Sequence, residues 1–356
     1  MKIAVGLSGG VDSAVAALLL QREGHEVSGV LMTLWPGPEG PAPVRSACYG
    51  PDEAADIRAA AEVAARLGIP FRTVDCAADY EGLVLRYFRE AYAAGTTPNP
   101  CVRCNERVKF GILPAAARAA GLAFDRFATG HYARLGLDAA TGRRVLMRAA
   151  DPAKDQSYFL YRLSQAQLAE ALFPLGGLTK ARVRALAREA GLPVHDRRES
   201  QDFYAGDIGD LVGPGPGDGE IVDRDGRVLG RHRGVGYYTV GQRKGLGISS
   251  PVPLYVLAID AAANRLVVGP ESETLRRSAS VRDCVWGPFE SPAAPLRVRA
   301  KVRSGGRPVP ALVTPLDGGS CRVDFDEPVA AVAPGQSAVF YDGETVAGGG
   351  VIEAAA

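Results

Sequence analysis

The sequence carries no excess of charge of either sign, because its 356 residues include 41 Lys and Arg against 40 Asp and Glu. Bulk charge therefore predicts no nucleic-acid partner, and any basic surface must be local. The N-terminus lacks the charged start and long apolar core of a signal peptide, and no apolar run is long enough to span a bilayer. We therefore expect a cytoplasmic protein.

Cysteine is sparse, with six residues in the whole chain. Six thiols in a cytosolic protein of this length do not predict a disulfide framework. Cys101 and Cys104 form a CxxC pair that needs an explanation, whereas the other four could be ordinary buried side chains. There is no second CxxC and no nearby His pair, which disfavours a structural zinc site.

The length exceeds what one small core needs and fits two or three domains. Residues 1–200 alternate between short apolar runs and helical patterns. The expected strands are 3–7, 27–32, 71–74, 124–128 and 144–147, and the expected helices are 11–23, 52–67, 80–94, 109–120, 165–173 and 179–190. Repeated strand–helix units of this kind predict an α/β fold with a doubly wound parallel sheet.

The pattern changes near Gly206, and the GPGPGDG segment at 213–219 is typical of a linker or turn. Short strand-like runs follow at 220–223, 227–229 and 237–240, and later at 296–303, 309–313, 321–325 and 338–341. We expect a small central β-rich domain and a C-terminal β-barrel. The predicted division is 1–208, 209–275 and 276–356.

The strongest motif is SGGVDS at 8–13, between an expected strand and an expected helix. Gly9 and Gly10 let the backbone approach a phosphate closely, and the helix N-terminus supplies free N–H groups. Asp12 suits such a place if a cation lies between it and the phosphates, so we assign it to Mg²⁺. No Lys follows the glycines, which excludes a Walker A loop.

The CxxC pair lies in TPNPCVRCN at 97–105, where Pro98 and Pro100 predict an extended approach to a helix. A Cys at a helix N-terminus is expected to have a lowered pKa, and nearby Arg103 and Arg107 would lower it further. A thiolate here could attack an activated carbon, carry a persulfide sulfur or bind a metal. Two unreactive thiols are the plain alternative.

Five segments together resemble the tRNA-specific 2-thiouridylases, a family of PP-loop ATP pyrophosphatases. They are SGGVDS at 8–13, TPNPCVRCN at 97–105, ATGHY at 128–132, KDQSYFL at 154–160 and GQRKGLG at 241–247. The resemblance covers nearly the whole chain. It implies ATP-dependent 2-thiolation of the wobble uridine of tRNA through an adenylated uracil, with ATP and Mg²⁺ as cofactors and a cysteine desulfurase or relay protein as sulfur donor.

The resemblance also implies roles for individual residues, with Cys104 as nucleophile beside Cys101, and Asp12 in catalysis. The implied ATP-binding residues are Gly6, Leu7, Ser8, Gly9, Gly10, Val11, Asp12, Ser13, Met32 and Gly130. The implied tRNA-binding residues are Asn99, Pro100, Cys101, Lys154, Asp155, Gln156 and Arg303, followed by Ser304 where the family usually has Tyr. Independently, alternation places Arg297, Arg299, Lys301 and Arg303 on one face of an expected strand, as a basic stripe or a solvated barrel face.

One departure concerns the sulfur carrier, because the family usually has a second catalytic Cys where this chain has Tyr204. Two hypotheses follow. Either Cys101 carries the persulfide beside Cys104, or Cys101, Cys104 and a third thiol hold a [4Fe-4S] cluster with one open iron. Cys48 is the preferred third ligand and Cys76 the second choice. The rival functions are another PP-loop amidating or ligating synthetase and a non-catalytic tRNA-binding relative.

Overall fold

The computed structural model describes residues 1–37, 47–197, 202–204, 206–213 and 215–356. Contacts divide the chain into two units. The first comprises Met1–Val84, Cys101–Gly206 and Glu344–Val346, and the second comprises Leu85–Pro100, Asp207–Gly343 and Ala347–Ala356. Each unit is described by itself. No helix in the described ranges is both long and apolar enough to cross a membrane.

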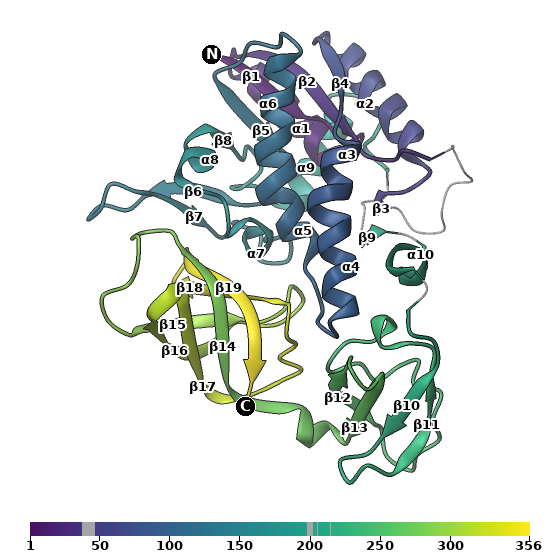
Figure 1. Cartoon of the computed structure of the whole chain (residues 1–356). Coiled ribbons are helices and arrows are strands. Elements are labelled where there is room, and N and C mark those ends of the chain that lie inside the picture. The colour runs from purple at the N-terminus through teal and green to yellow at the C-terminus, as the bar shows by residue number, and fades with distance from the viewer. Residues whose placement is uncertain (38–46, 198–201, 205, 214) are drawn as a thin grey trace. The chain divides into compact units, whose positions relative to one another are not determined.

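The first unit is built on a five-stranded parallel sheet in the order β4-β2-β1-β5-β8 (Figure 1). The strands are β1 (Lys2–Gly6), β2 (Glu26–Thr33), β4 (Phe71–Asp75), β5 (Arg126–Thr129) and β8 (Ala171–Leu172). Ile3, Ala4 and Val5 are fully buried, as expected for a central strand covered on both faces. The order places β1 at the point where successive strands diverge, and ligands of such sheets bind at the carboxyl ends there. The predicted parallel α/β sheet is confirmed.

Helices α1 (Val11–Arg22), α2 (Glu53–Leu67) and α9 (Lys180–Glu189) contribute to the main core of this unit. Their apolar residues pack with those of β1 and β2. Helix α2 ends at Gly68, whose φ of 66° is the left-handed conformation usual after a helix. Thr179 caps α9 by accepting a hydrogen bond from the Arg182 N–H, and Ser164 and Gln167 form a reciprocal capping box on α8 (Gln165–Glu170).

The helical region around the CxxC pair differs from the expected simple helices. It consists of α3 (Ala77–Tyr80), the π-helical run η1 (Glu81–Leu85), α5 (Pro100–Arg103), the π-helical run η2 (Cys104–Ile112) and α6 (Leu113–Ala119). Pro100 occupies the first position of α5, where its missing N–H costs nothing. Since π-helical runs are rare and are frequently found at functional sites, η2 marks this region for attention.

The remaining strands of the unit were only partly predicted. β6 (Arg134–Leu137) and β7 (Arg144–Met147) form an antiparallel hairpin, followed by α7 (Ser157–Leu160). β3 (Ala47–Tyr49) pairs in parallel with β9 (Asp202–Tyr204), and the register aligns Tyr49 with Tyr204. This pair brings two segments about 150 positions apart in the sequence side by side.

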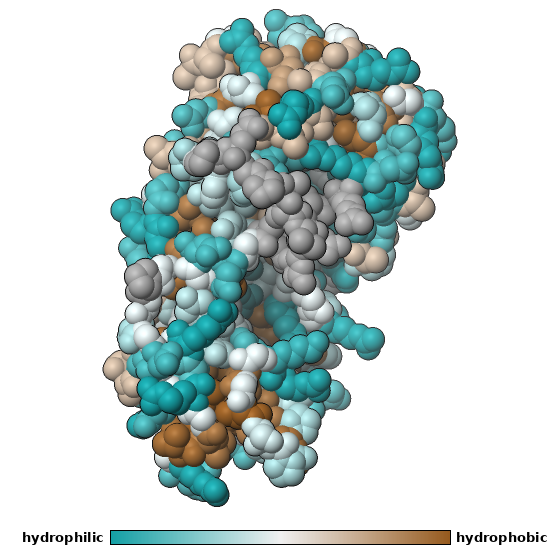
Figure 2. All heavy atoms as spheres, turned by 90° about the vertical axis from the view of Figure 1, so that its right-hand side faces the viewer, coloured by the Kyte–Doolittle hydropathy of each residue, from teal (hydrophilic) through white to brown (hydrophobic). Residues whose placement is uncertain are grey.

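The second unit contains α4 (Arg86–Ala93), α10 (Ile208–Val212), a small central sheet and a barrel. The central sheet has the order β11-β10-β13-β12, from β10 (Gly219–Val222), β11 (Val228–His232), β12 (Tyr255–Asp260) and β13 (Arg265–Gly269). The strand expected at 237–240 was wrong, because Val235–Tyr237 forms a 3₁₀ turn instead. The single-turn 3₁₀ segment η4 (Glu271–Thr274) follows the sheet. Val228 and Val252 are each 51% exposed, and Figure 2 shows apolar atoms at the surface of this part of the chain.

The predicted C-terminal β-barrel is confirmed, with six strands and its own apolar core. They are β14 (Leu275–Trp286), β15 (Leu296–Lys301), β16 (Val309–Leu316), β17 (Ser320–Ala330), β18 (Ser337–Asp342) and β19 (Thr345–Ala355), with the 3₁₀ turn η5 (Asp317–Gly319) between β16 and β17. Pairing of β14 with both β17 and β19 closes the barrel. The boundaries predicted at 208 and 275 stay predictions.

Candidate functional site

The glycine-rich turn lies between β1 and α1, as its motif requires. Gly10 caps α1 without any side-chain hydrogen bond, so the first N–H groups of the helix remain available to an anion. Ser13 Oγ accepts a hydrogen bond from the Ser8 N–H at 3.1 Å and lies 3.3 Å from Ser8 Oγ. These contacts shape residues 8–13 into a compact turn that presents N–H and hydroxyl groups, the donors that a phosphate needs.

Asp12 meets a cation that the sequence analysis did not identify. Lys180 Nζ, at the start of α9, donates to both carboxylate oxygens of Asp12 at 2.7 and 2.8 Å. The hydroxyl of Tyr132 donates to the same carboxylate at 2.8 Å. The side chains of Lys180 and Asp12 are only 12% and 26% exposed. A lysine in the first turn of a helix opposes the helix dipole, and this was the one signal that could have drawn attention to Lys180.

Gly130, expected near the nucleotide, packs against the turn. A Cβ atom at this position would lie 2.6 Å from the Ser13 backbone nitrogen and 2.7 Å from the Asp12 carbonyl carbon. The next residue, His131, is half-buried, and Thr129 Oγ1 lies 2.8 Å from its Nδ1. Burial and the neighbouring charge of Lys109 hold the pKa of His131 well below its usual value, so the ring is neutral at neutral pH.

An arginine also supports the turn and joins it to Asp56 of α2. Arg197 donates to the Gly9 carbonyl at 2.8 Å and to Asp56 Oδ1 at 2.5 Å. Gly9 has a φ of 70°, and a Cβ atom there would lie 2.6 Å from the Arg197 guanidinium. Burial raises the pKa of Asp56 to about 6, although the charge of Arg197 opposes the rise. The turn is therefore held by side chains from several elements.

The other expected nucleotide residues lie along the same sheet. Gly6 ends β1, and Leu7 is buried beside Val11 in the core of the unit. Met32 lies near the carboxyl end of β2, with its backbone paired to Val74 of β4. Its position suits contact with an adenine ring and ordinary packing equally well.

The CxxC pair spans the junction between α5 and η2, and this changes the expected acidity. Cys104 begins the π-helical run rather than standing at a helix N-terminus. Burial raises its pKa to about 11, and Lys109 only partly offsets this effect. The expected low pKa of Cys104 was therefore wrong, because desolvation outweighs the helix dipole.

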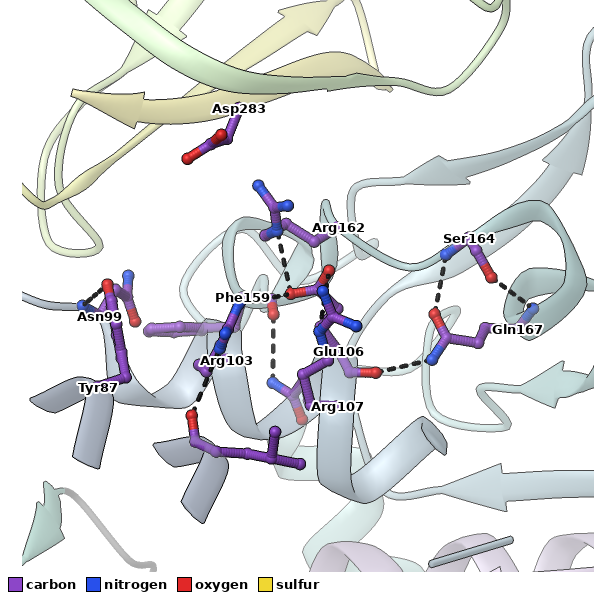
Figure 3. A network of polar contacts seen from close by, with 12 residues as sticks. Tyr87, Asn99, Arg103, Glu106, Arg107, Phe159, Arg162, Ser164, Gln167 and Asp283 are labelled. Atoms are coloured by element: carbon purple, nitrogen blue, oxygen red, sulfur yellow. Dashed lines mark hydrogen bonds and ion pairs between the residues drawn. The ribbon is translucent and has the colours of Figure 1, made fainter. Parts of the chain in front are cut away.

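The two arginines expected to assist the thiols are directed elsewhere. Arg103, Arg107 and Arg162 surround Glu106, whose side chain is 13% exposed (Figure 3). The shortest contact is from Arg162 Nε to Glu106 Oε2, at 3.1 Å. The cation that acts on Cys104 is instead Lys109, five residues further along η2. In a π-helix the backbone bonds join residues five apart, so both side chains rise from the same side.

Four thiols are linked electrostatically to the buried Tyr80 or to one another, and we call them the thiol cluster: Cys48, Cys76, Cys101 and Cys104. Charges on Cys104, Cys48 and Cys101 all contribute to raising the pKa of Tyr80, after the larger effect of burial. Burial also raises the pKa of Cys76 to about 12, with Cys104 among the contributing charges. Within the described ranges, however, no three His, Cys, Asp or Glu side chains are arranged to hold a metal ion.

Two of the residues expected to contact tRNA, Asn99 and Asp155, are largely buried. Asn99 is buried and its N–H lies 3.4 Å from the Tyr87 hydroxyl (Figure 3), within the second unit, where Pro100 also lies. Asp155 is 4% exposed and accepts hydrogen bonds from Arg148, Ala149 and Ser157. That burial suits a structural role better than direct contact with RNA.

The other residues expected at tRNA are the neighbours of Asp155 and the basic residues of the barrel, and most of them are at least partly exposed. Gln156 accepts a hydrogen bond from the Tyr132 N–H at 2.8 Å, which links this segment to the residue that holds Asp12. Lys154 is partly exposed. In the barrel, Arg297, Arg299, Arg303 and Ser304 are exposed and Lys301 is partly exposed. Arg297 pairs with Asp326 at 2.7 Å, so part of the stripe's charge is neutralised.

Comparison with known proteins now adds to this geometry. Three family profiles match in order: the tRNA methyl transferase HUP domain over residues 1–204, the tRNA methyl transferase PRC-barrel domain over 212–270 and the aminomethyltransferase β-barrel domain over 276–352. The tRNA-specific 2-thiouridylase MnmA of Endomicrobium trichonymphae is 46% identical over 356 residues, which covers 99% of both chains. The enzyme of the same name from Geobacter metallireducens is also 46% identical, over 99% of this chain and 97% of its own.

Among solved structures, the NMN synthetase of Francisella tularensis is 19% identical with a TM-score of 0.34, over 55% of this chain and 65% of that chain. This likeness is too weak to bear on function.

Proposed function

The chain belongs to the tRNA-specific 2-thiouridylase family, and from this premise we propose that it replaces O2 of the wobble uridine of tRNA with sulfur. The enzyme uses ATP and acts on tRNA. The observations that best support the chemistry are the packing of the segment 129–131 against the turn and the action of one lysine on both this segment and the CxxC pair. Gly130 packs on Asp12 and Ser13, and the charge of Lys109 acts on both His131 and Cys104.

The first step activates the base. The triphosphate lies on the N–H groups of the turn, and uracil O2 attacks the α-phosphorus. An O–P bond forms, pyrophosphate leaves with the electron pair of the broken P–O bond, and the N3 proton is lost. Oriented N–H donors stabilise the charge that builds up on the phosphates. Lys180 holds the Asp12 carboxylate in place beside them.

Mg²⁺ fits this arrangement as a proposal. Mg²⁺ often takes only one or two carboxylates from a protein when phosphates and water supply its other ligands, and Asp12 would be such a carboxylate. Lys180 already contacts both of its oxygens, so a metal would share Asp12 with the lysine. When bound, the ion would neutralise charge on the departing pyrophosphate.

The second step delivers sulfur, and Tyr204 stands where relatives usually have the carrier Cys. We propose that Cys101 carries a persulfide whose terminal sulfur attacks C2, while AMP leaves with the electron pair of the C2–O bond. The Cys104 thiolate then attacks the Cys101 sulfur. This releases the thiolated base, which regains its proton at N3, and leaves a Cys101–Cys104 disulfide that an external dithiol reduces.

The [4Fe-4S] alternative is not supported by the arrangement of the thiols. Cys48, Cys101 and Cys104 share the surroundings of Tyr80 without forming a three-ligand group in the described chain. We therefore assign no step to a cluster. Iron and sulfide analysis after anaerobic purification tests this directly, since an iron-free and fully active protein removes the cluster hypothesis.

The remaining assignments are proposals on the same premise. The division is a catalytic domain at 1–208, a central domain at 209–275 and a tRNA-contacting barrel at 276–356. Asn99, Pro100, Lys154, Gln156 and the barrel stripe would position the RNA, and Asp155 would hold Lys154 and Gln156 in place. The sulfur donor is a cysteine desulfurase or relay protein in the cytoplasm.

The test is to incubate the purified protein with ATP, Mg²⁺, unmodified tRNA and a persulfide donor and to analyse nucleosides by mass spectrometry. We expect 2-thiouridine together with AMP and pyrophosphate in equal amounts. ATP–pyrophosphate exchange that ignores tRNA would support a small-molecule synthetase instead. Binding of tRNA without any ATP turnover would support a non-catalytic relative.

A further inference from the structure

Three arginines converge on the carboxylate of Glu106, and we call them the arginine patch: Arg103, Arg107 and Arg162 (Figure 3). Arg103 ends α5, Arg107 belongs to η2 and Arg162 follows α7, all within the first unit. Arg162 Nε donates to Glu106 Oε2 at 3.1 Å. Arg107 Nε lies 3.6 Å from Oε1, and Arg103 Nη1 lies 4.0 Å from Oε2. Three cations therefore meet one anion, which leaves two positive charges in excess among these four side chains.

The members of this group differ in exposure, with an inner pair and an outer pair. The side chains of Glu106 and Arg162 are 13% and 16% exposed, whereas those of Arg103 and Arg107 are 34% and 51% exposed. The inner carboxylate offsets the mutual repulsion of the guanidinium groups and restrains them. The contact of Arg107 with Glu106 is longer than a hydrogen bond, so it does not use up the five N–H donors of this guanidinium. The outer pair is therefore held in place and can still bind an anion from solvent.

The chain itself places the outer pair beside the reactive thiols. Arg103 lies between Cys101 and Cys104 in the sequence, and Arg107 is three residues beyond Cys104 on η2. Arg103 and Arg107 are four residues apart in a continuous helical run, a spacing that puts two side chains on one side of the run. A ligand that reaches the CxxC pair thus comes close to both guanidinium groups.

The target of thiolation brings its own anions to this place. A base must leave its stack to reach an active site, and the phosphates on either side of the nucleotide move with it because they are covalently attached. Arginine binds phosphate well, since its planar fork can donate two parallel hydrogen bonds to two phosphate oxygens. An acidic protein surface could also meet exposed arginines, but nothing requires it to come within one nucleotide of the thiols.

We propose that the arginine patch binds the backbone phosphate next to the target uridine and holds the extruded nucleotide with its base directed at the CxxC pair. This proposal rests on the proposed thiolation and adds a binding surface to it. Arg103 and Arg107 contact the phosphate, while Glu106 and Arg162 keep them in position. The patch acts in tRNA binding, before ATP is used, and takes part in no covalent step.

The first test measures binding of tRNA without ATP between 0.05 and 1 M KCl, by fluorescence anisotropy. Each contact with a phosphate of a single strand contributes about 0.7 to the slope of log affinity against log salt, which corresponds to about fivefold in affinity at 0.1 M. Arg107→Gln should lose about this much. Arg107→Lys should keep the slope because it keeps the charge. At 1 M KCl all proteins should bind alike.

The matched control is Arg118→Gln. Arg118 is 43% exposed and also pairs with a glutamate, Glu170, but it lies on α6. This variant should keep the slope and the affinity of the wild type. Melting temperatures of all variants are compared, and we expect Arg107→Gln to melt as the wild type does because its side chain is half-exposed.

The second test identifies the phosphate. A tRNA assembled by ligation carries an uncharged methylphosphonate directly 5′ or 3′ of the wobble uridine. One of these two substitutions should weaken binding to the wild type about fivefold, the value of one contact at 0.1 M salt, and should have no further effect on Arg107→Gln. A methylphosphonate in the acceptor stem should affect both proteins equally.

Three results overturn the proposal. One is an unchanged salt slope in the double variant Arg103→Gln/Arg107→Gln. Another is a loss of affinity that is equal at 0.05 and 1 M KCl and comes with a lower melting temperature, which would indicate a structural role. The third is normal tRNA binding with slower sulfur transfer from a loaded cysteine desulfurase, which would indicate an acidic protein partner. A wild-type protein that shows the expected slopes but forms no 2-thiouridine would contradict the proposed function while supporting the patch.

Discussion

Cys104 and Lys109 lie five residues apart on η2, and the charge of Lys109 lowers the pKa of Cys104 against the stronger effect of burial. Lys109→Met should therefore raise this pKa further and slow alkylation of Cys104 by iodoacetamide at pH 8. Because only the thiolate reacts, the rate should fall about tenfold for every pH unit by which the pKa rises. Lys109→Arg keeps the charge and should keep most of the rate.

The measurement is site-resolved mass spectrometry after timed alkylation, with Cys284 in the barrel as an internal reference in the same digest. Reaction at Cys284 should not change in either variant. Equal alkylation of Cys104 in the wild type and Lys109→Met would show that Lys109 does not act on this thiol.

Lys180 provides a second prediction, since it is the cation that contacts both oxygens of Asp12. Lys180→Met leaves a half-buried carboxylate without its ion pair and should reduce tRNA-dependent pyrophosphate release by about 10- to 100-fold, the usual cost of a charged hydrogen bond. The matched control is Lys2→Met, because Lys2 pairs with Glu26 at 3.8 Å on the exposed surface. Unchanged pyrophosphate release in Lys180→Met would remove Lys180 from the site.

The raised pKa of Asp56 leads us to expect that the free energy of unfolding depends on pH. Its pKa is raised from 3.8 to about 6, so between these values the folded state binds a proton that the unfolded state has lost. The stabilising contribution is present below about pH 4 and is lost as pH rises to about 6, by at most about 3 kcal/mol. Asp56→Asn should flatten this part of the curve of unfolding free energy against pH.

The control for Asp56→Asn is Glu62→Gln, a change on an exposed residue of the same helix. Urea unfolding from pH 4 to 7 measures the slope for all three proteins. The slope is compared rather than absolute stability, because Asp56→Asn also deprives Arg197 of its partner. A slope unchanged by Asp56→Asn would contradict the assignment.

Gly130→Ala tests the close packing of the turn. The added methyl group would lie 2.6 Å from a backbone nitrogen and 2.7 Å from a backbone carbon, and neither atom can move without displacing α1. We expect loss of ATP-dependent pyrophosphate release and a lower melting temperature. Gly177→Ala, where a Cβ atom meets open space, should leave both quantities unchanged. Wild-type activity in Gly130→Ala would indicate that the turn is not held at this position.

The parallel sheet followed from sequence because its signals are local and repeated. The runs expected at 3–7 and 71–74 are short strand patterns bounded by turn residues, and they match β1 and β4 closely. Strands β3 and β9 were not predicted, since each has three residues and is defined by its pairing with a distant segment. Nothing in a run of three residues indicates such a partner.

Some residues of the candidate site were predicted from the sequence and others were missed, because the missed ones depend on contacts between distant segments. Asp12 and the thiols lie in motifs, whereas Lys180 reaches Asp12 from 168 positions away. The effect of Lys109 depends on a π-helical register, because on an α-helix residues five apart point about 140° away from each other. The acidity expected for Cys104 failed because burial, which no motif encodes, decides it.

The most direct test is a single-turnover reaction of Cys104→Ser with ATP, tRNA and a persulfide donor, followed by nucleoside mass spectrometry. The account predicts that AMP is released, that tRNA accumulates joined through C2 to the persulfide sulfur of Cys101, and that 2-thiouridine falls below one hundredth of the wild-type yield. A wild-type yield of 2-thiouridine from Cys104→Ser would contradict it.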